Sequence, residues 1–432
     1  MADAPFWLTD GYAPVADEVT LLDLPVKGEL PAALRGSFLR NGPNPRTASH
    51  HWFLGDGMVH GLRFEDGRAA AYRNRWVRTR SFTGEASFFG PDGQRDFTAA
   101  VANTHVVRHA GRILALVETS LPYELTPDLE TVGPYDFGGR LAGPMTAHPK
   151  TCPTTGELHL FGYDFQPPFL EYHVADASGR LTTSRVVDVK GPTMIHDFNL
   201  TERFVVFMDL PIVFDLELAM GGDALPYRYD PSYGARLGVL RRDDPHGDVR
   251  WFEIEPCYVF HPFNAHDDGA VITIDVSRYA HLDKHTIADP AVLWRWTIDL
   301  AAGTVTERQL DDRPGELPRV DDRLVSLPAR RGWQSTLPRD DVEGAITVYD
   351  LEAETSVTRR FEGGQGPGEA VFVPADDEPG GPGWLLTYVY DPATDTTDLV
   401  VLDVDDVAGD EVARVHLPVR VPHGFHGSWL PD

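Results

Sequence analysis

Cysteine is scarce in this sequence. Its 432 residues contain only two, Cys152 and Cys257, which cannot build a disulfide framework and do not form a CxxC pair. Disulfides are rare in reducing compartments, so the sequence predicts two buried thiols in a cytoplasmic protein. We assign neither thiol a chemical role.

Positive charge is scarce as well. Lys and Arg number 38 against 66 Asp and Glu, which leaves a formal net charge of -28. Nucleic acids and anionic lipid headgroups bind through clustered Lys and Arg side chains. The charge balance therefore argues against a nucleic-acid partner, and above all it indicates a protein that stays soluble.

Long apolar runs are also missing. The first residues, MADAPFWLTDGYAP, have no basic region followed by an apolar core, and no segment reaches the roughly 20 apolar residues that a transmembrane helix needs. There is no P-loop and no GxGxxG in a βαβ setting. We therefore expect a cytoplasmic protein that uses no nicotinamide cofactor.

β-strand patterns fill the sequence instead. Short runs rich in Val, Ile, Tyr, Phe, Trp and Thr alternate with clusters of Gly, Pro, Asp and Asn. The clearest runs span residues 111–118, 157–165, 203–210, 249–256, 270–277 and 384–391. Four further segments have a strand–turn–strand pattern: 170–189, 292–310, 345–361 and 399–417. Helical content should be low, with a helical turn or a loop at residues 215–227.

Hairpins that repeat along a whole chain are typical of a β-propeller, in which each blade is a small antiparallel sheet. A sandwich or a large barrel would give a similar pattern. No linker divides the chain, and the Pro- and Gly-rich stretch at residues 376–384 lies between two strand patterns, which indicates a loop. The sequence predicts a single domain over residues 1–432.

Four histidines stand in distinctive short contexts. They are His148 in MTAHP, His196 in MIHDF, His261 in FHPFNA and His426 in GFHGSW. Neutral imidazoles are common ligands of transition metals, so four of them could hold one ion. Their spacing is far longer than that of any local metal motif, so it does not show that they converge. A single histidine beside apolar strands is more often a buried core residue.

These contexts belong to a series of motifs along the chain. The motifs are FLRNGPNP (38–45), HWFLGDGMVHG (51–61), RNRWVRT (73–79), ANTHVVRHAGR (102–112), LPYELTPDLETVG (121–133), ELPRVDDR (316–323), GEAVFVP (368–374) and VPHGFHGSW (421–429). In this order they resemble the motifs of the carotenoid cleavage oxygenases, and the resemblance covers essentially the whole chain. The compact chain with its short N-terminal segment is similar to a bacterial member.

The resemblance implies a fold and a metal centre. The expected fold is all-β, a seven-bladed β-propeller with loops and helices forming a dome over the face that contains the metal. His148, His196, His261 and His426 would be the catalytic ligands of a non-haem Fe(II) ion. Remote residues can meet in a propeller, because the innermost strands of the blades line a central axis.

The resemblance also implies the surroundings of the metal. In the family the ligand histidines hydrogen-bond three glutamates, which fix the imidazole tautomer. The matching positions here are Glu118, Glu316 and Glu369. Thr104 falls where a threonine methyl lies near an open metal position. Phe53 and Phe263 are candidates for lining an apolar substrate tunnel, although ordinary core positions would explain them equally well.

Such a centre would use dioxygen as cosubstrate to cleave the C=C bond of an apolar alkene into two carbonyl products. The family is not known to need a nicotinamide or 2-oxoglutarate. The stilbene-cleaving branch has a Lys immediately before the first of the three glutamates, where it hydrogen-bonds the substrate phenol. This chain has Val117 there, which favours an apocarotenoid over a stilbenoid, unless a hydroxyl such as that of Tyr123 replaces the lysine.

The reaction and contact with a membrane stay open. The protein could be a non-oxidative, isomerohydrolase-like iron enzyme, or a propeller that only binds and holds no metal. The segment LPIVFDLELAM (210–220) could contact a membrane at the mouth of the tunnel, or it could be a core strand. We expect no obligate protein partner.

Overall fold

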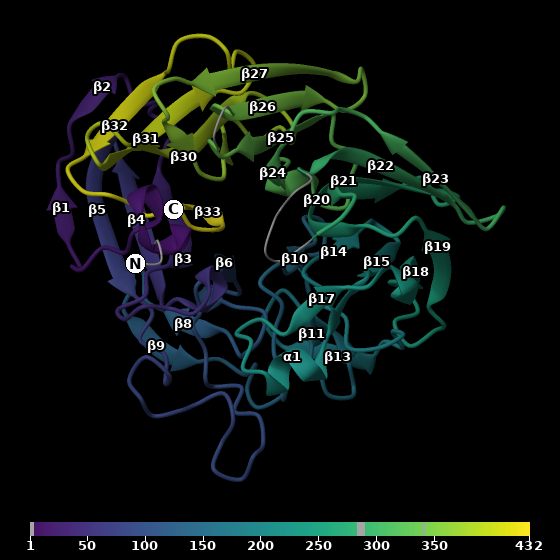
Figure 1. The fold of residues 1–432 in the computed structure, drawn as a ribbon. Coiled ribbons are helices and arrows are strands. Elements are labelled where there is room, and N and C mark those ends of the chain that lie inside the picture. Colours follow the sequence, from purple (N-terminus) through teal and green to yellow (C-terminus); the bar gives the residue numbers. More distant parts are fainter. Residues whose placement is uncertain (1–3, 283–289, 340–341) are drawn as a thin grey trace. The chain divides into compact units, whose positions relative to one another are not determined.

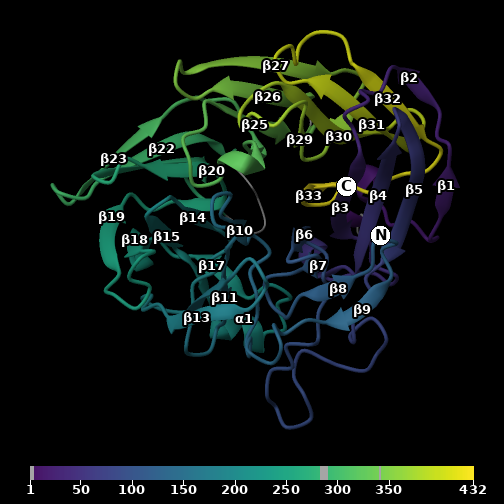
Figure 2. The same cartoon turned by 180° about the vertical axis from the view of Figure 1, so that it is seen from behind.

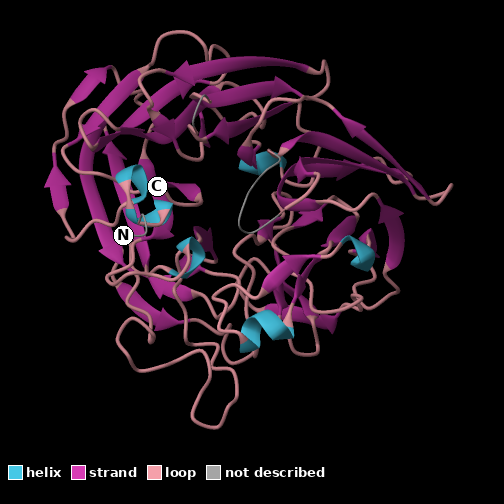
Figure 3. Ribbon diagram, in the orientation of Figure 1, coloured by secondary structure: helices cyan, strands magenta, loops and turns pink. Residues whose placement is uncertain are grey.

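Strands dominate the structure, a computed structural model that describes residues 4–282, 290–339 and 342–432 (Figure 3). In that part of the chain α1 (Leu216–Met220) is the one α-helix. Short 3-10 helices occur at η1 (Phe6–Leu8), η2 (Asp10–Tyr12), η3 (Trp52–Leu54), η4 (Pro231–Tyr233) and η5 (Asp322–Leu324). The predicted helical turn within residues 215–227 is confirmed by α1, which the Asp215 carboxylate caps by accepting hydrogen bonds from the backbone N–H groups of Glu217 and Leu218.

Within the described residues, seven main sheets follow one another in chain order, each built mostly from consecutive strands (Figure 1). The first contains β1 (Thr20–Leu22), β5 (Arg68–Trp76), β4 (Gly57–Glu65), β3 (Gly36–Pro43) and β33 (Gly427–Pro431). The second contains β6 (His105–His109), β7 (Arg112–Leu116), β8 (Tyr123–Leu125) and β9 (Thr131–Pro134). The third contains β10 (Lys150–Thr151), β11 (Leu158–Tyr163), β12 (Leu170–Ala175) and β13 (Leu181–Val186).

The remaining four sheets follow the same plan. The fourth contains β14 (Phe198–Leu200), β15 (Phe204–Asp209), β18 (Ala235–Arg241) and β19 (Arg250–Ile254). The fifth contains β20 (Tyr258–Asp267), β21 (Val271–Tyr279), β22 (Val292–Asp299) and β23 (Thr304–Gln309). The sixth contains β24 (Glu316–Arg319), β25 (Arg331–Thr336), β26 (Gly344–Asp350) and β27 (Thr355–Phe361). The seventh contains β2 (Val26–Gly28), β32 (Ala413–Leu417), β31 (Thr396–Asp403), β30 (Gly383–Asp391), β28 (Gly366–Pro367) and β29 (Val371–Pro374).

The four hairpins predicted from the sequence are all present. They are the antiparallel pairs β12–β13, β22–β23, β26–β27 and β31–β32. Alternation of apolar and polar residues identified them, because successive side chains of a strand point to opposite faces of its sheet. The seven sheets agree in number with the seven blades expected.

The chain divides into two compact units. Met1–Asp136, Trp333–Asp350 and Thr355–Asp432 form one, here called the terminal unit, and Phe137–Gly332 with Leu351–Glu354 form the other, here called the central unit. The prediction of a single domain over residues 1–432 is not tested by this division and stays a prediction.

Both ends of the chain contribute strands to the terminal unit. The C-terminal strand β33 pairs with β3 from Gly36↔Pro431 to Arg40↔Gly427, and β2 near the N-terminus pairs with β32 (Figure 1, Figure 2). Phe38 on β3 packs against Tyr388 on β30, with ring centroids 5.1 Å apart. The residues just before β33 are held against β3 as well, because the Phe425 backbone N–H donates to the Asn41 carbonyl and the Asn41 backbone N–H donates to the His426 carbonyl, each at 3.0 Å.

The core of the central unit lies among the third, fourth and fifth sheets. Tyr172, Phe198, Phe207 and Trp296 are fully buried in it. An insertion between β15 and β18 carries β16 (Ile212–Phe214), α1 and β17 (Tyr227–Tyr229), where β16 and β17 form a small sheet of their own. The insertion interrupts the fourth sheet's order of consecutive strands.

The structure bears on the two cysteines and on membrane-spanning helices. Cys152 and Cys257 are both buried and free, as predicted. Among the described residues, no helix combines the length and the apolar character that crossing a membrane requires. The cytoplasmic location stays a prediction.

Candidate metal centre

Three of the predicted ligands converge in the central unit. His148 lies just before β10, His196 just before β14, and His261 on β20. The Nε2 atom of His196 lies 3.0 Å from that of His148 and 3.2 Å from that of His261. Each of the three offers a ligand nitrogen within 4.8 Å of the other two. The three Nε2 atoms therefore face one another.

An irregularity in β20 directs His261 toward this point. The pairing of β20 with β21 shifts register between Val259 and Pro262 and again between Pro262 and Asn264. Bulges of this kind interrupt the ladder and re-aim a side chain, and they are frequent beside active sites. Pro262 adds to the effect, because it has no N–H to donate to the ladder. The FHPFNA motif is thus a locally broken strand that presents a histidine.

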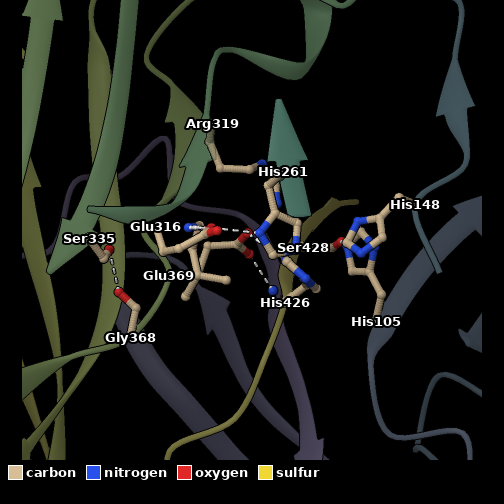
Figure 4. A network of polar contacts seen from close by, with 12 residues as sticks. His105, His148, His261, Glu316, Arg319, Ser335, Gly368, Glu369, His426 and Ser428 are labelled. Carbon is tan, nitrogen blue, oxygen red and sulfur yellow. Dashed lines mark hydrogen bonds and ion pairs between the residues drawn. The ribbon is translucent and has the colours of Figure 1, made fainter. Parts of the chain in front are cut away.

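A carboxylate determines which nitrogen of His261 faces the centre. The His261 Nδ1 lies 2.7 Å from Glu316 Oε2, the contact drawn between the two residues in Figure 4. A carboxylate accepts this hydrogen bond, so Nδ1 carries the proton and Nε2 of the neutral ring presents a lone pair. Glu316 Oε2 is held in turn by the backbone N–H of Leu317 at 2.7 Å.

The arrangement fits a transition-metal ion. If all three neutral rings carry their proton on Nδ1, as His261 does, their Nε2 lone pairs repel one another at these distances, and a cation between them removes the repulsion. Two nitrogens that bind one ion at a right angle with bonds of about 2.1 Å would be about 3.0 Å apart, close to the separations found. An all-imidazole set suits iron, copper, zinc or nickel rather than calcium or magnesium.

Asp197 is a carboxylate of this region that the sequence prediction did not include. It is only 2 % exposed, and both of its oxygens lie 2.9 Å from Lys150 Nζ. Burial raises the pKa of Asp197, although the Lys150 ammonium lowers it. Its Oδ2 lies 3.7 Å from His148 Nδ1. The only sequence signal was its position directly after His196.

His426 lies in the terminal unit with a similar hydrogen bond. Its Nδ1 is 2.9 Å from Oε1 of Glu369, which is 3 % exposed, and the other oxygen of Glu369 accepts from the backbone N–H of Gly427 at 2.6 Å (Figure 4). Gly427 begins β33, so the pairing of β33 with β3 positions this imidazole. Its Nε2, like that of His261, is left to present a lone pair.

Thr104 and Phe53 are neighbours of His426 in this unit. The His426 backbone N–H donates to the Thr104 carbonyl at 3.1 Å, and the Thr104 hydroxyl donates to Asn103 Oδ1 at 3.1 Å. Asn103 Nδ2 in turn donates to the carbonyl of Phe53 at 2.9 Å. The Phe53 ring lies 5.7 Å from that of Phe425, the residue before His426. The sequence analysis missed Phe425, although it stands in the GFHGSW motif.

Phe263 and Phe260 differ in their surroundings. Phe263 is buried, and a Cβ added at Gly332 would come within 2.8 Å of its Cδ1, so its ring packs closely against β25. Phe260 is half-buried and meets the His196 ring edge-on, with centroids 5.1 Å apart. Phe260, which the sequence analysis did not select, is therefore in direct contact with a candidate ligand. The role of Phe263 stays a prediction.

Glu118 and Val117 follow β7 in the terminal unit. Glu118 is half-buried in the turn after the strand, and its role at the metal stays a prediction. Val117 packs in a hydrophobic cluster that includes Tyr123. The Tyr123 hydroxyl donates to Thr98 O at 2.6 Å and accepts from Arg80 N at 2.9 Å. It is engaged inside the fold, so the structure disfavours Tyr123 as the substitute for a phenol-binding lysine.

Other buried histidines have different partners. The Nδ1 atoms of His60, His159 and His173 hydrogen-bond hydroxyls, those of Tyr72, Tyr172 and Ser184. Burial lowers the pKa of His159 to about 3 and that of His173 to about 4. These histidines are neutral core residues. A carboxylate at Nδ1 thus distinguishes His261 and His426 from the core histidines.

Seven meandering sheets with converging imidazoles are typical of a β-propeller metalloenzyme. A family model described as RPE65, retinal pigment epithelial membrane protein, matches residues 12–431. The chain belongs to this family, that of the carotenoid cleavage oxygenases, which confirms the resemblance found in the sequence. It is therefore an enzyme, a cleavage oxygenase of the family.

Three known proteins show the extent of the likeness. A carotenoid cleavage oxygenase of Mycobacterium tuberculosis is 39 % identical over 98 % of this chain and 97 % of its own, which agrees with a bacterial member. The structure of a Pseudomonas brassicacearum lignostilbene dioxygenase has a TM-score of 0.89 at 29 % identity and covers 100 % of both chains. That of a Synechocystis apocarotenoid oxygenase variant has a TM-score of 0.87 at 28 % identity and covers 99 % and 98 %. The seven-bladed β-propeller prediction is confirmed.

Because burial lowers the pKa of core histidines such as His173, we expect the protein to lose stability in acid. The unfolded chain binds a proton at His173 with a pKa near 6.5, and the folded chain does so only at about 4. The unfolded state binds more protons between these values, so the free energy of unfolding falls as the pH drops through this window, by about 3 kcal/mol. His173→Asn should remove this part of the loss, measured by urea denaturation at pH 7 and pH 4. An unchanged pH dependence in the variant would contradict the assignment.

Proposed function

We propose that this protein is an Fe(II)-dependent oxygenase that uses dioxygen to cleave a C=C bond of an apocarotenoid-like substrate into aldehyde or ketone products. The observation that carries the proposal is the convergence of the Nε2 atoms of His148, His196 and His261, with Glu316 holding the Nδ1 proton of one of them. Core histidines of this chain show no such convergence among the described residues.

In this proposal His426 is the fourth ligand. Its support is the hydrogen bond to Glu369, which repeats the His261–Glu316 pair, and its place in the motif that the family shares. Glu118 would serve as the third ligand-orienting carboxylate. Four imidazoles leave up to two positions open on a six-coordinate ion, and Thr104, whose carbonyl binds the His426 backbone, would lie beside one of them.

The residues of the chain prepare the site in three ways. Bound Fe(II) would supply the activation of dioxygen for alkene cleavage. Glu316 and Glu369 keep the Nδ1 protons in place, which orients the rings and raises the basicity of Nε2. Phe53 and Phe425 form an aromatic surface beside His426, and Phe260 one beside His196. Such surfaces exclude water and suit a flat, apolar polyene.

Val117 supports the choice of substrate. It is 7 % exposed and packs in an apolar cluster, so no cation stands at the position where the stilbene-cleaving branch binds a phenol. The structure disfavours Tyr123 for this role, because its hydroxyl donates to the Thr98 carbonyl and accepts from the Arg80 backbone N–H. A stilbenoid substrate is the second candidate, and the likeness to the lignostilbene dioxygenase structure is the observation that favours it.

Aerobic turnover by the Fe(II)-loaded protein tests the function. We expect cleavage of an apocarotenal, with aldehyde products identified by mass, and little cleavage of a hydroxystilbene in the same assay. His196→Ala should abolish cleavage, because it removes a ligand, whereas the core variant His173→Asn should retain it. Preference for the stilbene would overturn the substrate. Oxygen-independent conversion would indicate an isomerohydrolase-like enzyme, and protein that neither binds iron nor turns over would indicate a binding propeller.

Glu369→Gln tests whether His426 belongs to the ligand set. The substitution keeps the shape of the side chain but removes the charge that holds the His426 Nδ1 proton. We expect the affinity for Fe(II) to fall by about 10- to 100-fold, measured anaerobically by competition with a chelator. The matched control is Glu130→Gln, an exposed residue of the same unit that pairs with Arg75. Equal affinities of Glu369→Gln and the wild type would remove His426 from the proposed set.

Contact with a membrane is part of the proposal. Within the predicted segment, Leu210 and Val213 are buried, which agrees with a core strand, but Leu216 and Met220 on α1 are 63 % and 80 % exposed. The exposed pair would be the contact, because apolar side chains gain free energy on entering the bilayer interface. Replacing both by Ser should reduce partitioning into liposomes. Unchanged partitioning would refute the contact.

A further inference from the structure

Two segments that carry candidate ligands are joined by an ion pair between a half-buried lysine and a buried aspartate. Lys150 lies two residues after His148, and Asp197 directly follows His196. Lys150 Nζ reaches both oxygens of Asp197 at 2.9 Å, and the side chains are 20 % and 3 % exposed. The Asp197 carboxylate is fixed further by the Phe198 backbone N–H at 2.6 Å.

Thr146 provides a second link between the same segments. Its hydroxyl accepts from the His148 backbone N–H at 3.0 Å and donates to the His196 carbonyl at 3.5 Å. Thr146 is fully buried. The spacing of the two imidazoles, whose Nε2 atoms are 3.0 Å apart, is therefore determined by polar contacts on both sides of the ligand segments.

Asp197 also lies beside the imidazole of His148. It faces Nδ1, the nitrogen that in His261 and His426 faces a glutamate. The distance from His148 Nδ1 to Asp197 Oδ2 is 3.7 Å, longer than a direct hydrogen bond but close enough for a strong electrostatic effect in a buried site. A negative charge at this place favours the tautomer with its proton on Nδ1. Nε2 then presents its lone pair to the centre.

We propose that Lys150 and Asp197 are positioning residues of the metal centre: the pair orients His148 and sets its spacing from His196. The inference rests on the proposed function, since it needs a metal at the imidazoles. Lys150 also keeps Asp197 from becoming a metal ligand itself. A carboxylate so near the imidazoles could otherwise bind the ion. With both oxygens held by the ammonium group, Asp197 stays directed at Nδ1, and the pair adds no net charge.

If the Lys150–Asp197 pair only stabilised the fold, its removal would have a different effect. Buried ion pairs contribute little net stability compared with apolar residues of the same volume, and they are costly when one partner is removed. A structural pair would therefore affect unfolding only. A positioning pair must also affect how the folded protein binds a metal ion in the absence of substrate and oxygen.

Binding of Co(II) to the full chain tests the inference. We expect Asp197→Asn to weaken Co(II) binding by about 10- to 100-fold in competition with a chelator, and to shift the visible absorption bands of the bound ion. The control is Asp267→Asn. Asp267 is also buried and paired with an arginine, Arg203, at 3.0 Å. It lies six residues along β20 from His261, or about 20 Å, and its variant should bind as the wild type does.

A double variant covers the case in which Asp197→Asn does not fold. Lys150→Met combined with Asp197→Asn removes both charges, so no unpaired charge is left buried, and the same loss of affinity is expected. Wild-type affinity and an unchanged spectrum in the folded variants would overturn the inference and leave the proposed function standing. Failure of the wild-type protein to bind either Co(II) or Fe(II) would overturn both.

Discussion

The hydrogen bond between an imidazole Nδ1 and a glutamate carboxylate is the interaction on which the candidate centre depends. Glu316 makes it with His261, and Glu369 makes it with His426. Each bond decides the tautomer of a neutral ring, so the ring that could have been an ordinary core residue presents a lone pair instead. His173, which bonds a serine hydroxyl, shows the alternative. The carboxylates thus make candidate ligands of these two histidines.

Strand pairing places these hydrogen bonds. His426 precedes β33, and β33 is held by β3 from the other end of the sequence, so the position of one imidazole depends on a contact between remote parts of the chain. His261 depends instead on a local irregularity, the register shifts around Pro262 in β20. A regular sheet therefore supplies the frame, and its interruptions direct the functional side chains.

The strands were predictable because their signal is local. Alternation at period two is enough to identify the hairpins at β12–β13, β22–β23, β26–β27 and β31–β32. The candidate ligands were selected through family motifs and not through spacing, which is uninformative over such distances. Asp197, Phe260 and Phe425 were missed, although each adjoins a selected histidine, because neighbouring residues on a strand or loop differ in where they point. Phe263 was selected for its motif, and Phe260 of the same motif packs edge-on against His196.

The class of fold, the acidic composition, the free thiols and the family follow from the sequence alone, through composition, periodicity and ordered motifs. The folded chain was needed to decide which nitrogen of His261 and of His426 bonds a carboxylate, that the Tyr123 hydroxyl is engaged elsewhere, and that Lys150 and Asp197 join the segments of His148 and His196. The physical reason is distance: hydrogen bonds and ion pairs act over about 3 Å, and they form between residues that pairing of remote strands brings together. No local pattern in a sequence encodes that proximity.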